Sequence, residues 1–260
     1  MTSPRDTNRR LLLLLWAPLA VIVAGWIVHF ARLAEGGEIG TLFSSVLLVP
    51  AVVGLMLYVR RKKEKQLAVA LLAPTPAAFR ELAFGNGGTI PYGLQMATAN
   101  VATVTALYGD VEEADRSLRA ISWDGCPPMV DAQRSVARAV IAYARGDYGG
   151  GRSHAIRAAM EADIPEGFPG ASTSALAVRM HEALGRALSG TMNDESRRVL
   201  ELAREKLPLL GKVLAAWGLA AIAKREENEA HLAEQVTFLR THAPHFAPVF
   251  ASLEGDETAL

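Results

Sequence analysis

The chain has 260 residues, half of them hydrophobic, which is enough to bury a core in one or two domains. Its formal charge is zero, yet residues 1–65 carry 9 Lys and Arg against 4 Asp and Glu, whereas residues 66–260 carry 18 against 23. The single cysteine excludes an intramolecular disulfide, and the acidic balance of the larger part argues against nucleic-acid binding.

Two apolar stretches near the N-terminus predict a transmembrane hairpin over residues 11–59, after a short N-terminal segment at 1–10. Residues 11–33 contain no acidic side chain, and as a helix they would cover roughly 35 Å. Residues 41–59 contain no charge and would cover roughly 28 Å. The link at 34–40 is long enough only for a turn, so two spans are expected.

Basic residues at the outer ends of the two stretches predict that both termini are cytoplasmic, in a multi-pass protein of a bacterial inner membrane. Arg9 and Arg10 precede the first stretch and a run of five cations follows the second, whereas the turn carries Glu35 and Glu38. A signal peptide is the competing interpretation, because Arg9-Arg10 resembles a twin-arginine start. The apolar run is longer than a signal-peptide core, however, and no small-residue cleavage site follows it.

Few polar features lie inside the predicted spans. His29 and Arg32 are the ionisable residues there, and their position at the outer end favours snorkelling to the headgroups over a functional role. Ala20 and Ala24 offer a small-residue face through which the hairpin could form an oligomer.

Residues 60–90 form a basic juxtamembrane helix and linker. Each cation near anionic headgroups contributes about 1 kcal/mol to membrane association. The residues expected to contact anionic lipid are Arg60, Arg61, Lys62, Lys63 and Lys65.

Every segment beyond the basic run has the periodicity of a helix, broken at Gly, Pro and Asp. A helical domain is therefore expected over residues 91–250, with a flexible tail at 251–260. The predicted helices of this region, with a short one before it at 75–83, are 91–108, 111–121, 129–145, 148–162, 172–189, 194–206, 209–224 and 226–242.

One helix shows the pattern most clearly. Val111, Ala114, Leu118 and Ile121 form a single apolar stripe, and Asp110 is placed to cap the N-terminus. Such a stripe needs a neighbouring helix to cover it.

These helices resemble tetratricopeptide repeats, in which two antiparallel helices of a unit are joined by a tight turn and packed through small residues. Gly109-Asp110 looks like the family's turn, and Gly146-Asp147 repeats it 37 residues later. The small positions of the family are filled by Ala102, Ala114, Gly151, Ala155, Gly185, Gly218 and Ala230. The resemblance implies an all-α fold in which a transmembrane hairpin precedes a repeat domain; an unrelated helical bundle is the alternative.

The resemblance also implies a groove lined by the first helix of each unit. Its lining is mostly apolar and lacks the Lys, Arg and Asn set with which some family members clamp a carboxylate, so an amphipathic helix of a partner protein is the expected ligand. The alternative is that these residues pack against the chain's own helices. The groove residues are Met96, Thr103, Gln133, Val136, Val140, Tyr143, Leu219 and Ile222.

No reaction is indicated, and the chain is expected to be neither an enzyme nor a holder of a metal or cofactor. Glu227 and His231 share a helix face, but His242 and His245 flank a proline and cannot readily join them. Cys126 lies in a turn with no histidine nearby, and the glycine clusters at 85–88 and 146–151 lack a phosphate-binding motif.

Two functions fit these features. The first is a membrane-anchored interaction module, a scaffold or assembly factor that presents its helical domain at the cytoplasmic membrane surface. The second is a small structural or regulatory subunit of a transport or secretion complex, which acts through its transmembrane hairpin.

Overall fold

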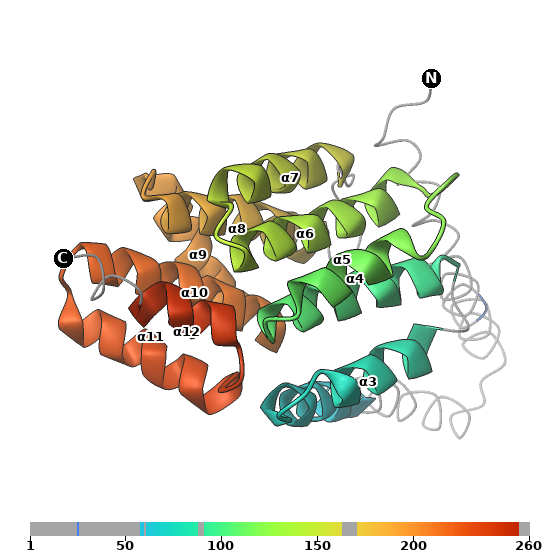
Figure 1. Cartoon of the computed structure of the whole chain (residues 1–260), viewed down its shortest axis with the longest axis horizontal. Coiled ribbons are helices and arrows are strands. Elements are labelled where there is room, and N and C mark those ends of the chain that lie inside the picture. The colour runs from blue at the N-terminus through green and yellow to red at the C-terminus, as the bar shows by residue number, and fades with distance from the viewer. Residues whose placement is uncertain (1–24, 26–57, 60, 88–90, 163–170, 255–260) are drawn as a thin grey trace, which may run out of the picture.

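The computed structural model describes residues 25, 58–59, 61–87, 91–162 and 171–254, and within them the chain is all-α, as the sequence predicts (Figure 1). A helix at 61–72 comes first. The helices that follow are α3 (Ala77–Gly87), α4 (Gly93–Leu107), α5 (Val111–Arg119), α6 (Pro128–Ala144), α7 (Tyr148–Glu161), α8 (Ala171–Ser189), α9 (Asp194–Lys206), α10 (Leu209–Arg225), α11 (Glu229–His242) and α12 (Ala247–Glu254).

The predicted membrane spans fall almost wholly outside this description. Only Gly25, Tyr58 and Val59 of the two stretches are described, and all three are helical. In the part of the chain that the structure describes, no helix combines the length and the apolar character needed to cross a bilayer. The hairpin, its orientation and the membrane location therefore stay predictions.

Eight of the helices form four consecutive antiparallel hairpins, α4–α5, α6–α7, α8–α9 and α10–α11. In each hairpin a short turn joins two helices that pack against each other. The first helices of the hairpins also pack in series, α4 on α6, α6 on α8 and α8 on α10. Figure 1 shows the hairpins side by side along the long axis of the domain.

The same turn recurs inside the hairpins. An Asx side chain caps the second helix of all four by accepting a hydrogen bond from the backbone N–H three residues later: Asp110 from Glu113, Asp147 from Gly150, Asn193 from Ser196, and Asn228 from His231. Three of these caps, Asp110, Asp147 and Asn228, also donate their own N–H to the carbonyl five residues earlier, which closes a Schellman turn.

The residue before each of those three caps has a left-handed backbone. Gly109 and Gly146 have φ values of 97° and 81°, whereas Glu227 has a φ of 54°. The fourth hairpin thus makes the turn of the first two without glycine. Because this turn extends to the Asn228 cap, the second helix begins at Glu229 and not at the predicted Glu226.

These turns give a pair of opposite stability effects. Gly146→Ala is expected to lower the free energy of unfolding by about 1–2 kcal/mol, because a Cβ is strained at positive φ although the surrounding space is open. Glu227→Gly relieves the same strain and is expected to raise it by up to about 1 kcal/mol. Urea unfolding followed by circular dichroism measures the free energy of unfolding of both variants. A change in the same direction in both would contradict the turn assignment.

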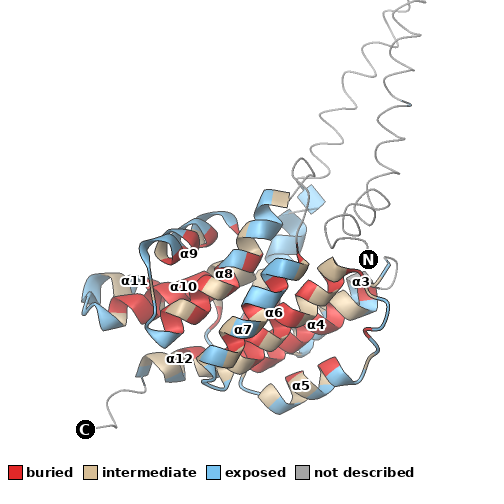
Figure 2. Cartoon of the chain, turned by 90° about the horizontal axis from the view of Figure 1, so that it is seen from above, coloured by how far each residue is buried: buried red, intermediate tan, exposed pale blue. Residues whose placement is uncertain are grey.

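The buried residues, coloured red in Figure 2, lie on the helix faces that point toward the neighbouring hairpins. Their largest cluster extends from Leu71 and Phe79, at the N-terminal side, through Leu184 and Trp217 to Phe246. The predicted stripe of α5 is confirmed, since Ala114 and Leu118 are fully buried in a second, separate cluster and Val111 and Ile121 pack against it. Ala230, a predicted small packing position, is instead exposed.

The last helix joins the two ends of the series. The sequence predicts no helix after His242 and a flexible tail from 251, yet α12 continues to Glu254. It contacts both α10 and α4, the last and the first of the serially packed helices. The helical domain is therefore closed by its own C-terminal helix.

Candidate functional sites

The eight predicted groove residues lie mostly in the core. Val140, Tyr143, Leu219 and Ile222 are at most 4% exposed and belong to the largest core cluster, and Val136 belongs to a separate small cluster. The Thr103 hydroxyl is buried and donates to the Ala99 carbonyl.

Met96 and Gln133 are the two that stay partly exposed, and Met96 packs against a third cluster. The structure thus brings four of the eight together, inside the protein. To contact a partner, the six buried residues would need the helices that cover them to move. Their role in partner binding therefore stays a prediction.

Tyr143 occupies the contact between three helices. Its ring lies so close to Gly151 of α7 and Gly185 of α8 that a Cβ at either glycine would overlap it. Its hydroxyl donates a hydrogen bond of 2.8 Å to the His181 carbonyl, and burial raises the pKa of the phenol. Gly151 and Gly185, which fill small positions of the predicted repeat, therefore accommodate this one ring.

His181 is buried beside that bond. Its Nδ1 lies 2.7 Å from the Ala177 carbonyl, so Nδ1 carries the proton and donates it. Burial lowers the pKa of His181 to about 4, and the hydrogen bond to Ala177 offsets this only in part. His181 is consequently a neutral core residue at neutral pH.

The low pKa of His181 predicts a pH dependence of stability. The unfolded chain takes up the proton near pH 6.5, whereas the folded chain resists it down to about pH 4. The contribution is complete above pH 6.5 and is lost as the pH falls, by about 3 kcal/mol at pH 4. His181→Asn, which retains a donor toward Ala177, is expected to flatten the urea-unfolding profile between these pH values. His245→Asn, at an exposed site, serves as control; an unchanged slope in the His181 variant would refute the assignment.

The C-terminal helix is fixed to the serially packed helices by specific bonds. Trp217 of α10 donates from Nε1 to the Ser252 hydroxyl at 2.8 Å, and Lys224 donates from Nζ to the Leu253 carbonyl at 2.7 Å. The fully buried Phe246 meets the edge of Tyr108, with ring centroids 5.3 Å apart.

Tyr108, just past the end of α4, also holds the N-terminal side. Its hydroxyl donates to the Ala73 carbonyl at 2.7 Å, with the Leu71 carbonyl at 3.3 Å, at the end of helix 61–72. One tyrosine therefore contacts both the end of helix 61–72 and the turn that precedes α12.

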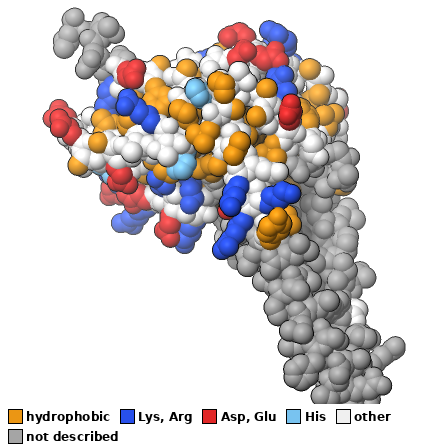
Figure 3. Space-filling model, turned by 90° about the horizontal axis from the view of Figure 1, so that it is seen from below, with side chains coloured by type: hydrophobic (Ala, Val, Ile, Leu, Met, Phe, Trp, Pro, Cys, Tyr) orange, Lys and Arg blue, Asp and Glu red, His pale blue; other side chains and the backbone are white. Residues whose placement is uncertain are grey.

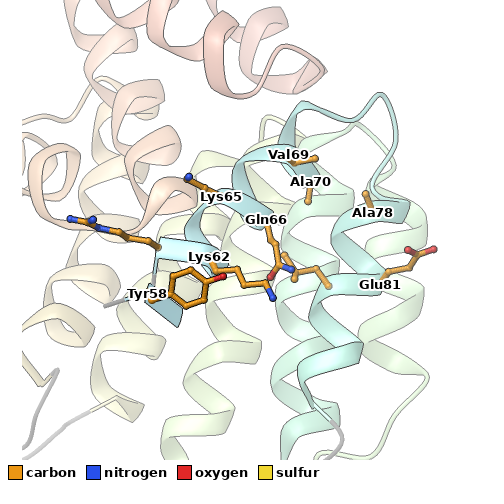
Figure 4. Close-up of a pocket in the computed structure, with 10 residues that line it drawn as sticks. Tyr58, Lys62, Lys65, Gln66, Val69, Ala70, Ala78 and Glu81 are labelled. Atoms are coloured by element: carbon orange, nitrogen blue, oxygen red, sulfur yellow. The ribbon is translucent and has the colours of Figure 1, made fainter. Parts of the chain in front are cut away.

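The predicted lipid-contact residues border an open hollow of about 730 Å³ between helix 61–72 and α3 (Figure 4). We call it the α3 hollow. Arg61, Lys62 and Lys65 line it, Lys63 is exposed outside it, and Arg60 lies outside the described residues. Its other lining residues are Tyr58, Gln66, Val69, Ala70, Ala78, Glu81 and Leu82.

The residues considered for chemistry do not converge. Burial raises the pKa of the Cys126 thiol, helped by Asp131, so this cysteine is a poor nucleophile. His231 pairs with Glu234 at 3.6 Å, and the His242 ring packs on Phe238. Among the described residues no group of His, Cys, Asp and Glu side chains is arranged to hold a metal ion.

Comparisons with protein-family models, curated proteins and solved structures find no match to this chain. Its function can therefore be inferred only from its own residues and their arrangement.

Proposed function

We propose that this chain is a membrane-anchored interaction protein, whose N-terminal hairpin holds a stack of helical hairpins at the cytoplasmic surface of an inner membrane. The stack serves there as a scaffold or assembly factor that binds another protein. Tethering of this kind raises the local concentration of the binding domain without any new contact.

The observation that carries the proposal is the recurrence of one hairpin design along the chain. Four second helices begin with the same Asx cap, and the first helices pack in series. Close helix contacts rely on glycine, since a Cβ at Gly218 would lie 2.9 Å from Leu200. These features resemble tetratricopeptide repeats, and stacked helical units of this kind offer extended surfaces for protein binding.

The domain also exposes apolar surface. Figure 3 shows hydrophobic side chains gathered in the middle of one face, with charged side chains toward its edges. Among the exposed large hydrophobic residues, Leu94 of α4 is 54% exposed and lies two positions before Met96. An apolar centre with a charged rim is typical of protein-binding surfaces and fits the apolar face of a partner's amphipathic helix.

Photo-crosslinking tests the proposal. A crosslinking amino acid at Met96 or Gln133, the partly exposed groove residues, is expected to capture the same discrete protein from native membranes. Position Arg198, exposed on α9, is the control and should capture nothing in common with them.

A truncated chain separates the proposal from action through the membrane hairpin. A fragment of residues 66–260 removes the anchor but keeps Leu67, Ala70 and Leu71, which pack against the core. The proposal expects this fragment to give the same adduct when the partner is supplied. Loss of every adduct from a folded fragment would instead favour a transport or secretion subunit that acts through its hairpin.

A further inference from the structure

A second hollow lies on the other side of the basic helix. It has a volume of about 560 Å³ and separates helix 61–72 from the turn between α9 and α10. We call it the turn hollow. Arg61 and Lys65, one helical turn apart, line both hollows and form the ridge between them. The other residues that line it are Glu64, Ala68, Glu205, Lys206, Leu207, Pro208, Leu209 and Lys212.

The two walls of the turn hollow come from distant parts of the sequence. Lys206 is the last residue of α9, and Lys212 lies in the first turn of α10. Leu207 between them is only 2% exposed and anchors the turn in the core. Core packing, and not chance exposure, therefore holds these two lysines opposite Arg61 and Lys65.

The cations around the two hollows form no direct ion pairs with carboxylates of the described residues. None of Arg61, Lys62, Lys65, Lys206 and Lys212 takes part in an ion pair with a described carboxylate, although Glu64, Glu81 and Glu205 line the hollows. Some arginines elsewhere in the domain do pair with carboxylates, as Arg179 with Glu195 at 2.7 Å and Arg186 with Glu182 at 3.1 Å. Five cations that form no ion pair with another described residue, gathered around one helix, favour an anionic ligand.

The α3 hollow adds an apolar surface next to these charges. Tyr58 is 64% exposed and Val69 is 70% exposed there, and Ala78 and Leu82 of α3 line the opposite side. Figure 4 shows Val69 and Ala70 on the helix facing the side of Ala78. A small inorganic anion would not use this surface, whereas the glycerol and acyl part of a lipid would be partly removed from water by it.

We propose that the phosphate headgroup of an anionic phospholipid binds in the turn hollow, between Arg61 and Lys65 on one wall and Lys206 and Lys212 on the other. The apolar part of the lipid passes over the ridge into the α3 hollow. The inference rests on the proposed membrane anchorage, and it adds the second wall that the linear basic run lacks.

The test compares two double variants of the full chain in detergent. Lys206→Gln with Lys212→Gln removes the second wall. Arg198→Gln with Arg240→Gln removes the same charge from exposed positions on α9 and α11 that are free of ion pairs in the described residues. Native mass spectrometry then measures the retention of phosphatidylglycerol against phosphatidylcholine. All four side chains reach the surface, and circular dichroism verifies that both variants fold.

The Lys206/Lys212 variant is expected to bind phosphatidylglycerol about 10- to 30-fold more weakly than the natural chain, while the Arg198/Arg240 variant binds it within about twofold. Equal losses in the two variants, or no loss in either, would overturn the site. A separate titration with inorganic phosphate decides the ligand: if phosphate alone binds these lysines as tightly as the lipid does, the lipid assignment is wrong.

These outcomes are separable from those of the proposed function. Failure of the lipid site leaves the crosslinks from Met96 and Gln133 in place. Failure of the interaction proposal removes those crosslinks, while lipid retention by the purified chain is unaffected. Extraction of native membranes with alkaline carbonate tests the anchor independently of both.

Discussion

Tyr143→Ala is expected to lower the free energy of unfolding by about 3–5 kcal/mol, the usual cost of removing a buried aromatic side chain. The ring is 1% exposed and fills the space left by Gly151 and Gly185, which have no side chains to move into the vacancy. Three helices, α6, α7 and α8, lose their common contact. Urea unfolding of the full chain, followed by circular dichroism, measures the loss.

Tyr143→Phe is the matched control, because it keeps the ring and removes only the hydroxyl. The His181 carbonyl loses its side-chain donor but stays bonded within α8, so the expected cost is about 1 kcal/mol. A Tyr143→Ala variant that loses less than about 1 kcal/mol would contradict the packing. If stability were kept and the partner crosslink lost, Tyr143 would be a groove residue, as the repeat register predicts.

Phe246→Ala is expected to cost about 3–5 kcal/mol, because the ring is fully buried and packs edge-on against Tyr108. For a domain of this size such a loss lowers the melting temperature by roughly 6–20 °C. The side chain belongs to the turn just before α12, so its removal also weakens the attachment of α12 to α4 and α10. Differential scanning calorimetry measures the shift.

Phe84→Ala provides the comparison for this change. Phe84 is 39% exposed on α3, and its truncation should cost about 1 kcal/mol or less. If the Phe246 variant melted no lower than the Phe84 variant, the closure of the domain by its C-terminal helix would be refuted.

Helix periodicity predicted most of the described fold, because the spacing of apolar residues along an amphipathic helix identifies the face that is buried. The stripe from Val111 to Ile121 is an example, as is the predicted Asp110 cap, whose side chain accepts a hydrogen bond of 3.2 Å from the backbone N–H of Glu113. Local patterns of this kind need no knowledge of the neighbouring helix.

Two local features were misjudged for identifiable physical reasons. The sequence predicts no helix after His242, yet α12 forms there, and Pro248 is its second residue, where a missing backbone N–H costs nothing. Glu227 adopts a left-handed backbone that sequence rules assign to glycine or asparagine, so the turn before α11 was not recognised.

The candidate sites were harder to predict than the helices, because they depend on what covers each face. The repeat register predicts that Val140, Leu219 and Ile222 line a partner-binding groove, whereas the structure buries all three in the core. The register of one helix does not tell which later helix packs on it. The lysines of the turn hollow are distant in sequence from the basic run, and only the packing of α9 and α10 brings them to it.

Tyr108 gives the domain a property that a row of stacked hairpins lacks. A row loses structure from its outermost units inward, since each end has a neighbour on one side only. Here the two outermost elements meet at a single phenol, through the Ala73 carbonyl and the Phe246 ring. Fraying at either terminus is thereby coupled to the other, so amide protons at both ends should exchange with solvent at similar, slow rates, and the whole array should melt cooperatively.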